Sequence, residues 1–345
     1  MAARLAAKFR APKPMAWEGF PTEQIHPGDT LVHFSSVALD GEYDRIRGTL
    51  ASTSISREVQ IARGGVSSHP PTLSYNLGPA IIADGTLYYP GGYEVMKAGM
   101  AKPIAYGRPR HFAVAQLCNS SLTEGFFGHW LLDTPALMIL AEQRGMPAVA
   151  VQTTAGSDHR TDYTRATGSP LEQVRLARIE QLWIVDDRPT NLGRASRLRE
   201  LRRRIREGVT GSSKRLILDR GLGGARRNLT NSQELWAMLE SEHGFEIIDP
   251  LAMSFADLAV ALNAAEIVVG VEGSALCHAV LASPENVLIF AIMPPTRFCT
   301  AVKWYTDMLG MKFGFCVAEG SETDFAVDVD RMRRAMAQVE QAVHD

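Results

Sequence analysis

The sequence predicts an α/β protein whose second half forms a parallel β-sheet covered by helices. Three observations predict this class. Apolar runs of strand length alternate with helical patterns over residues 212–292, the connections between them are short, and glycines stand where the runs end. Such alternation is typical of a parallel sheet with helices on both faces. Ligands of these sheets bind at the carboxyl ends of the strands, so the residues after each run are the first candidates for a site.

The elements of this half follow one another in a regular order. Asn231 and Ser254 each stand three residues before an acidic side chain, a pattern that marks the start of a helix, and Gly244 ends the first of these helices. The expected strands cover residues 214–219, 245–249, 266–270 and 287–292, and the expected helices cover 231–242, 254–265 and 274–282.

The stretch EIVVGVEGSALCH, residues 266–278, is the most informative in the chain. Its apolar run ends in Gly270, and Gly273 and Ser274 precede a helical pattern that begins at Ala275. The N-terminus of a helix carries unpaired N–H groups and about half a positive charge, so it attracts anions. An ordinary strand-to-helix turn without a ligand is the alternative interpretation.

Arginines follow the first strand of the same half. Arg220, Arg226 and Arg227 lie in a glycine-rich turn at the carboxyl end of that strand. Guanidinium groups bind phosphates through paired hydrogen bonds. Together with the turn at Gly273 and Ser274, they predict a site for a phosphate or diphosphate.

Composition limits the classes of function. The chain of 345 residues is long enough for two domains, and 36 basic against 38 acidic residues leave no basic field for nucleic acid. The sequence shows no signal-peptide pattern and no apolar run long enough to span a membrane. Four scattered cysteines suit a reducing compartment, so we expect a cytoplasmic protein.

The sequence suggests a division into four segments. An N-terminal domain covers residues 1–190, in which 79–90, 111–117, 146–152 and 180–186 are the strand candidates and 153–170 reads as a polar loop. A linker covers 191–213, and its helix carries seven arginines between Arg194 and Arg206 beside one thin apolar stripe. We interpret it as a solvated linker helix, with contact to an anionic membrane surface or an acidic glycan as the less favoured alternative. The second domain covers 214–320, and residues 321–345 end in a helix over 331–343 that Asp330 is placed to cap.

A second candidate site lies in FFGHWLLDTPALMIL, residues 126–140. His129 and Asp133 are four residues apart, so on a helix they share a face. A carboxylate that orients an imidazole makes it a better general base. Pro135 favours a break at this point, with Thr134 capping a new helix. The alternative interpretation is a core histidine tied to a capping aspartate.

With both sites described, the chain resembles glycosyltransferase family 61, which includes plant and animal xylosyl- and N-acetylglucosaminyl-transferases and many bacterial polysaccharide-biosynthesis proteins. GHWLLDTPALMIL resembles the family block that holds a histidine and an acidic residue four later, which correspond to His129 and Asp133. DRGLGGARRNLTNSQEL resembles its arginine-rich block, with Arg220, Arg227, Asn231 and Glu234 in corresponding places. The segment 244–290 resembles its long C-terminal block, whose glycine turn usually reads His-Gly-Ala and here reads Glu272-Gly273-Ser274.

The resemblance covers about residues 125–292 and implies a GT-B-like fold with two Rossmann-like domains, a cleft between them and a last helix that packs back on the first domain. It also implies an inverting, metal-independent transfer of a sugar from a nucleotide diphosphate donor to a glycan or lipid-linked acceptor, with no cofactor and no metal. Asp328 and Asp330 form a D-x-D, a pattern that holds a divalent metal in other sugar transferases, but helix capping explains it here.

The implied mechanism assigns roles to both sites. Arg220, Arg227, Asn231 and the turn Gly273-Ser274-Ala275 would bind the donor. His129, oriented by Asp133, would remove the acceptor proton, and Glu272, in place of the family histidine, would bind sugar hydroxyls or act as the base. Two rival classes stay open: a catalytically degenerate nucleotide-sugar-binding scaffold, which Glu272 favours, and a hydrolase that uses Ser274 or the neighbouring Cys277 and His278.

Overall fold

The protein consists of two compact units, neither of which is continuous in sequence. The computed structural model describes residues 19–96, 108–152, 159–211, 214–220 and 226–344. The first unit comprises Met1–Asp29 and Pro70–Arg197, and the second comprises Thr30–His69 and Leu198–Asp345. The sequence-based division placed residues 30–69 in the first domain, whereas they pack in the second unit. The reason is visible at Val37, whose N–H and C=O bond to Phe313 and Phe315 beside the last strand of the second sheet, at 2.9 and 3.0 Å.

The second unit is built on the parallel sheet that the sequence predicts. Five parallel strands lie in the order β14-β12-β15-β16-β17. Their bounds are β12 (Lys214–Leu218), β14 (Phe245–Ile248), β15 (Ala265–Val271), β16 (Leu288–Met293) and β17 (Lys312–Val317). Ile267, Val268 and Val269 are all fully buried, as expected for a strand covered on both faces. Gly270 pairs with Leu218 on one side and Ala291 on the other, so the carboxyl ends of these strands share one edge.

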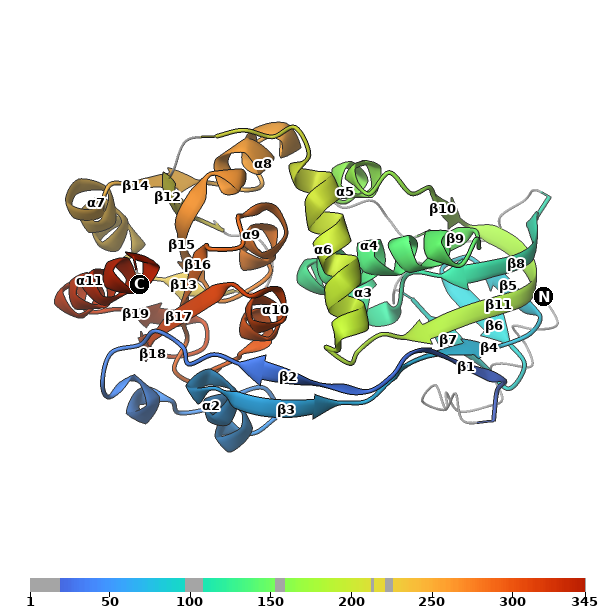
Figure 1. The fold of residues 1–345 in the computed structure, drawn as a ribbon, viewed down its shortest axis with the longest axis horizontal. Helices are drawn as coiled ribbons and strands as arrows, with labels where there is room; N and C mark the ends of the chain where they lie inside the picture. Colours follow the sequence, from blue (N-terminus) through green and yellow to red (C-terminus); the bar gives the residue numbers. More distant parts are fainter. Residues whose placement is uncertain (1–18, 97–107, 153–158, 212–213, 221–225, 345) are drawn as a thin grey trace. The chain divides into compact units, whose positions relative to one another are not determined.

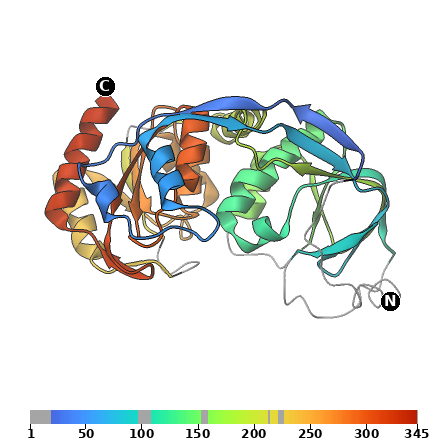
Figure 2. The same cartoon turned by 90° about the horizontal axis from the view of Figure 1, so that it is seen from below.

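Helices cover both faces of this sheet (Figures 1 and 2). One face carries α7 (Ser232–His243) and α11 (Val329–His344), and the other carries α8 (Phe255–Asn263), α9 (Leu276–Ala282) and α10 (Ala301–Leu309). Around them lie β2 (Asp29–His33), η1 (Glu42–Arg45), α2 (Ile55–Arg63), β3 (Gly65–His69), β13 (Asn228–Leu229), β18 (Glu319–Gly320) and β19 (Asp324–Ala326). Ser254 caps α8 as predicted, and Gly244 ends α7 in the left-handed conformation.

The last helix packs within its own unit. Met332, Met336 and Val339 of α11 are buried in the core that α7 forms with the sheet. The packing of this helix back on the first domain stays a prediction. Asp328 caps the helix, accepting a hydrogen bond of 2.7 Å from the Arg331 N–H, whereas Asp330 pairs with Arg333.

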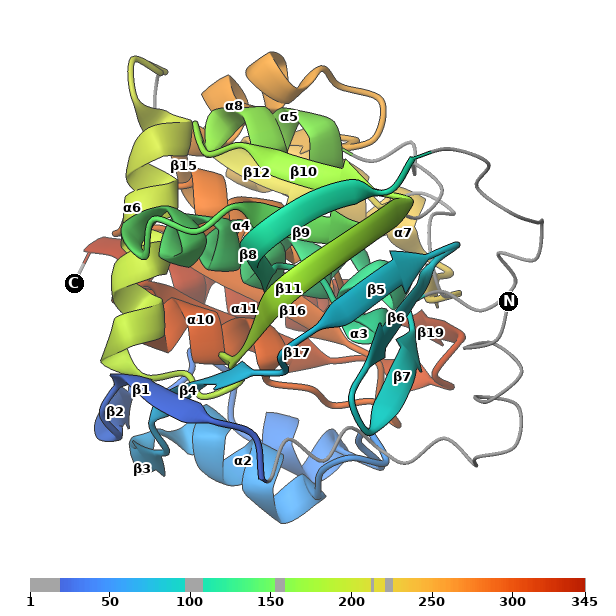
Figure 3. The same cartoon turned by 90° about the vertical axis from the view of Figure 1, so that its right-hand side faces the viewer.

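The first unit is also α/β, with a mixed sheet. Strands β10-β9-β8-β11 are parallel, and β5, β6 and β7 continue the sheet in antiparallel fashion (Figure 3). β4 also pairs with β11, and β1 pairs with β4. The bounds are β1 (Thr22–His26), β4 (Thr72–Asn76), β5 (Ala80–Ala83), β6 (Thr86–Tyr89), β7 (Gly92–Val95), β8 (Arg110–Leu117), β9 (Ala148–Val151), β10 (Leu171–Val174) and β11 (Leu176–Asp186). Asp84 and Gly85, both with positive φ, form the two-residue turn that joins β5 to β6. The first sheet is therefore only partly Rossmann-like.

Three helices accompany this sheet: α3 (Ser121–Gly125), α4 (Phe127–Gln143) and α5 (Arg160–Ala166). The predicted break at Pro135 is wrong, because α4 continues through it and Thr134 caps nothing. Proline removes one backbone hydrogen bond inside a helix, but Met138 and Ala141 of α4 are buried against Cys118 and stabilise the continuous helix. Helix α5 lies in the stretch predicted as a loop, of which residues 153–158 lie outside the described part.

The arginine-rich helix α6 (Leu192–Arg206) is not a solvated linker. Its residues divide between the two units at Arg197 and Leu198. Arg194, Arg197 and Arg202 are each at most 4% exposed, so one side of the helix is buried although it carries arginines. The single apolar stripe in the sequence did not indicate this burial, because arginines are counted as polar residues that face solvent. Among the described residues, no helix combines the length and the apolar character that crossing a bilayer requires.

Candidate functional site

Two arginines, Arg220 and Arg227, lie close to the turn at Gly273 in the second unit. Arg220 follows β12, and Gly273 follows β15, so both stand at the carboxyl edge of the parallel sheet. A Cβ atom on Gly273 would be 2.5 Å from Nη1 of Arg227 and 3.6 Å from Nη1 of Arg220, and the φ angle of Gly273 is +146°. Glycine at this position therefore lets the Arg227 guanidinium lie against the turn, whereas the distance to Arg220 would be an ordinary contact.

Glu272 is the counter-ion of this arginine pair. Its carboxylate accepts a hydrogen bond of 2.9 Å from Nη1 of Arg227, which also donates to the Glu272 carbonyl. The Nε atom of Arg297 lies 3.5 Å from the same carboxylate oxygen. Glu272 is only 6% exposed. The carboxylate thus pairs with two arginines, and the catalytic role predicted for Glu272 stays a prediction.

The group that we call the arginine cluster consists of Arg220, Arg227 and Arg297 with Glu272. Three positive charges against one negative charge leave a net charge of +2. Burial lowers the pKa of Arg220, and repulsion from Arg227 lowers it further, while Glu272 raises it. A cluster with excess positive charge at a sheet edge is suited to a polyvalent anion. Arg297 was missed in the sequence, although PPTR directly follows the fourth strand, where ligand-binding residues are expected.

Helix α9 begins two residues after the turn. Ala275 is its N-cap residue, and no side chain caps it. The carbonyls of Gly273 and Ser274 accept hydrogen bonds from Leu276 and Cys277, at 3.2 and 3.1 Å. Gly273, Ser274 and Ala275 are all partly exposed, so the turn remains accessible to a ligand.

Asn231 holds structure together in this geometry. It is the N-cap residue of α7, but its side chain makes no capping bond. Instead its amide donates to the Val327 carbonyl at 2.8 Å and accepts from the Val327 N–H at 3.2 Å. Arg226 is exposed and pairs with Asp324 at 2.7 Å. Neither side chain contacts the arginine cluster through a described bond, and the donor-binding role of Asn231 stays a prediction.

His129 and Asp133 form the pair that their spacing predicts. Both lie on α4, and Nδ1 of His129 is 3.4 Å from a carboxylate oxygen of Asp133. The His129 side chain is 47% exposed, whereas that of Asp133 is 21% exposed. A nearly half-exposed histidine is accessible to a ligand, which argues against the interpretation as a core histidine.

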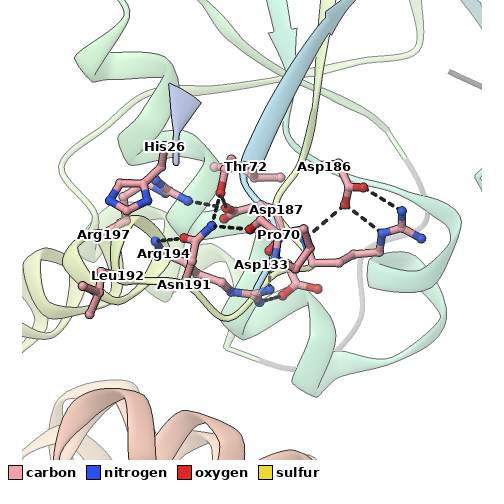
Figure 4. Close-up of polar contacts among 12 residues, drawn as sticks. His26, Pro70, Thr72, Asp133, Asp186, Asp187, Asn191, Leu192, Arg194 and Arg197 are labelled. Atoms are coloured by element: carbon pink, nitrogen blue, oxygen red, sulfur yellow. Dashed lines mark hydrogen bonds and ion pairs between the residues drawn. The ribbon is translucent and has the colours of Figure 1, made fainter. Parts of the chain in front are cut away.

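Arg194 is the second partner of Asp133. Sequence reasoning missed this contact, because the only signal at Arg194 is its place in an arginine-rich run. Its guanidinium donates to Asp133 and, at 2.6 Å, to the Asp187 carbonyl (Figure 4). Burial raises the pKa of Asp133, but the charge of Arg194 and the contact with His129 outweigh it, so the pKa lies below its usual value. Asp133 is therefore held as a carboxylate that orients His129.

A capped helix start positions Arg194. Asn191 accepts a hydrogen bond of 3.0 Å from the Arg194 N–H, and its amide donates to Thr72 at 2.9 Å (Figure 4). Asp187 binds Arg197 and accepts from Thr72 at 3.3 Å. These contacts join α6 to the start of β4 and to the residue that follows β11, and they hold Arg194 beside Asp133.

The residues of the hydrolase alternative are poorly placed. Cys277 and His278 are both buried in α9, at 6% and 2% exposure. Burial raises the pKa of Cys118 and of Cys299 to about 12, so these thiols stay protonated near neutral pH. Within the described residues, no group of three or more His, Cys, Asp or Glu side chains is arranged to hold a metal ion.

The structure thus brings together two sets of predicted residues, one in each unit. Arg220, Arg227, Glu272 and Gly273 meet in the second unit, and His129 and Asp133 meet in the first. The fold and these sets define the class: an α/β protein with a basic, glycine-containing site at the carboxyl edge of a parallel sheet. Residues 127–289 match the family model described as Glycosyltransferase 61, and this match supports a glycosyltransferase. The comparison with curated proteins found no match.

Proposed function

We propose that the protein is a glycosyltransferase that moves a sugar from a nucleotide diphosphate donor to a hydroxyl group of a glycan or lipid-linked acceptor. The match of residues 127–289 to the glycosyltransferase family carries this proposal. The matched segment includes His129, Asp133, Arg220, Arg227 and Gly273. A GT-B arrangement, in which one unit serves the donor and the other the acceptor, is part of the proposal.

The arginine cluster would bind the diphosphate of the donor. Its net charge of +2 suits a diphosphate, and Gly273 leaves room for the Arg227 guanidinium beside the backbone. As the bond to the sugar breaks, negative charge grows on the leaving diphosphate, and fixed positive groups stabilise it. The arginines would supply this stabilisation without a metal.

His129 would be the general base. The lowered pKa of Asp133 makes this carboxylate a weak base, but a strong orienting partner for Nδ1 of His129. The free Nε2 atom would then take the acceptor proton as the hydroxyl oxygen attacks the anomeric carbon. Attack from the side opposite to the diphosphate inverts the configuration at that carbon.

The donor site is tested by calorimetry with free nucleoside diphosphates, UDP, GDP and ADP, and with the Arg227→Ala variant. Hydrogen bonds to charged groups contribute about 1.5–3 kcal/mol, so we expect roughly 10- to 150-fold weaker binding. Arg226→Ala is the matched control, because this neighbouring arginine is exposed and pairs with Asp324; its affinity should change less than about threefold. Equal affinity in wild type and Arg227→Ala would remove Arg227 from the site.

The base is tested by turnover of the His129→Ala variant. General-base catalysis contributes about 10²–10⁴-fold, so the rate should fall by that factor while donor affinity is kept. His111→Ala is the control, because His111 is another exposed histidine of the first unit that contacts a carboxylate, Glu180, at 3.1 Å. Wild-type turnover of His129→Ala would exclude His129 as the base.

A second candidate function is a nucleotide-sugar-binding scaffold without turnover. The observation that favours it is Glu272, whose carboxylate already occupies two of the three arginines. The two functions differ in donor hydrolysis: a transferase releases nucleoside diphosphate slowly even without acceptor, whereas a scaffold binds the sugar nucleotide and leaves it intact.

A further inference from the structure

Three side chains of the second unit are arranged as a serine, a histidine and an aspartate in line. Nδ1 of His33, on β2, lies 2.7 Å from a carboxylate oxygen of Asp307, on α10. Nε2 of the same ring lies 2.7 Å from the hydroxyl of Ser67, on the paired strand β3. None of these residues belongs to the two sites described above.

The hydrogen bonds fix the direction in which protons are donated. Nζ of Lys303 lies 2.8 Å from both oxygens of Asp307, and both side chains are about 1% exposed, so Asp307 is held as a carboxylate. A carboxylate only accepts, so Nδ1 of His33 must carry the proton that it shares with Asp307. In the neutral ring Nε2 is then the acceptor, and the Ser67 hydroxyl donates to it. Because the single hydroxyl proton of Ser67 is then directed at His33, Nε2 of His69, which lies 2.9 Å from the Ser67 oxygen, is left to donate to that oxygen.

Ser67 lines a pocket. The pocket has a volume of about 480 Å³ and is lined by His33, Ser67, Trp304, Arg57, Gln60 and Ile61. Ser67 is partly exposed, whereas His33 is only 5% exposed. The His33 ring packs edge-on against Trp304, with ring centroids 4.6 Å apart, so it is held in one orientation. The volume lies in the range of sites for small molecules.

We propose that Ser67 is an activated nucleophile that cleaves small carboxylic esters bound in this pocket. Arg57 and Gln60 provide polar contacts for the substrate, and Trp304 and Ile61 provide apolar ones. The Ser67 oxygen forms a bond to the carbonyl carbon while its proton moves to Nε2 of His33. The ester bond then breaks, and the leaving alkoxide takes that proton. A water molecule then attacks the carbonyl carbon of the acylated serine and gives its proton to Nε2 of His33. The bond to the Ser67 oxygen breaks, that oxygen takes the proton back, and the carboxylic acid is released.

Lys303 limits the strength of this arrangement. Its charge offsets that of Asp307, so the aspartate orients His33 but stabilises the charged imidazolium less than an unpaired carboxylate would. We therefore expect a slow hydrolase whose serine is nevertheless far more reactive than an ordinary hydroxyl.

The experiment treats the full chain with a fluorophosphonate probe and locates the label by peptide mass spectrometry. The Ser67 oxygen bonds to phosphorus, fluoride leaves, and His33 takes the proton. Ser56 is an internal control, because it lines the same pocket and its hydroxyl contacts Ser54 at 3.1 Å. We expect label on Ser67 at least about 100-fold faster than on Ser56, the minimum that a general base contributes.

Variants then assign the reactivity to the histidine. Label should disappear in Ser67→Ala and persist in Ser68→Ala, whose serine is the exposed neighbour on β3. His33→Gln, checked for folding by its melting temperature, should slow the labelling of Ser67 about 10²–10⁴-fold. Absence of label on Ser67 in the wild type, or a rate equal to that of Ser56, would overturn the proposal and leave the three residues as a link between β2, β3 and α10. The wild-type comparison decides the matter even if His33→Gln does not fold.

Discussion

Replacing Glu272 with glutamine should weaken the fold and at the same time strengthen the binding of a diphosphate. The substitution keeps the size of the side chain and removes its charge. The arginine cluster then changes from a net charge of +2 to +3, because Arg220, Arg227 and Arg297 keep theirs. The two effects have opposite signs, so a general loss of structure cannot imitate the result.

The loss of stability follows from the burial of the pair. Removing one partner of a buried ion pair costs about 3–5 kcal/mol. The side chains of Arg227 and Arg297 are 12% and 22% exposed, so water reaches them in part, and glutamine still accepts a hydrogen bond. We therefore expect Glu272→Gln to lower the free energy of unfolding by about 2 kcal/mol.

The gain in affinity follows from Coulomb's law. A carboxylate about 6 Å from one phosphate charge, at an effective dielectric constant of about 20, repels it by about 3 kcal/mol. Salt screening and the greater freedom of the released arginines reduce this gain by about half. Glu272→Gln should therefore bind UDP roughly tenfold more tightly than the wild type.

Urea unfolding and calorimetry with UDP measure the two quantities on the same preparations. Glu322→Gln is the matched control, because Glu322 also contacts Arg297, at 3.3 Å, but its side chain is 54% exposed. Its affinity and stability should stay close to those of the wild type. Unchanged or weaker UDP binding by a folded Glu272→Gln variant would refute the assignment of the arginine cluster as a diphosphate site.

Three further predictions concern the two sites and the buried thiol of Cys299. Gly273→Ala should weaken UDP binding at least tenfold, because the new Cβ atom would displace Arg227. Gly65→Ala controls for backbone strain, because Gly65 has a φ of +131° and open space around it. Equal UDP affinities of Gly273→Ala and the wild type would contradict this prediction. Asp133→Asn should lower the stability more at pH 6 than at pH 3. A carboxylate with a lowered pKa stabilises the fold fully above its unfolded pKa and loses this effect as the pH falls through its folded pKa; a difference that does not depend on pH, by urea unfolding, would disprove it. Iodoacetamide should leave Cys299 unmodified in the folded protein, and rapid alkylation would show that its thiol is not held protonated.

Local sequence patterns predicted the second sheet well. A strand that is buried on both faces consists of a continuous run of apolar residues, such as Ile267–Val269. Glycines and capping residues mark where the helices begin and end. These signals depend on neighbours in sequence, so one chain is enough to recognise them. The spacing of His129 and Asp133 was readable for the same reason, because a helix fixes the contact between residues four apart.

Contacts between distant residues were not readable. The role of Glu272 depends on Arg227, 45 residues earlier, and on Arg297, and no local pattern pairs them. Arg194 contacts Asp133 over 61 residues, and its burial contradicts the usual meaning of an arginine in a helix. His33 contacts Asp307 across 274 residues of sequence, and no local sequence pattern near either residue predicts the contact.

The passage of the chain through the two units has a consequence for its synthesis on the ribosome. Residues 30–69 are made early, but the sheet on which they pack is not complete until β17 has been translated. The first unit, by contrast, is finished once Arg197 has emerged. Because domains tend to fold in the order in which they are made, Leu31, Ile46 and Ile61 stay exposed to solvent during this interval. The nascent chain therefore offers chaperones an early apolar segment that the finished protein hides.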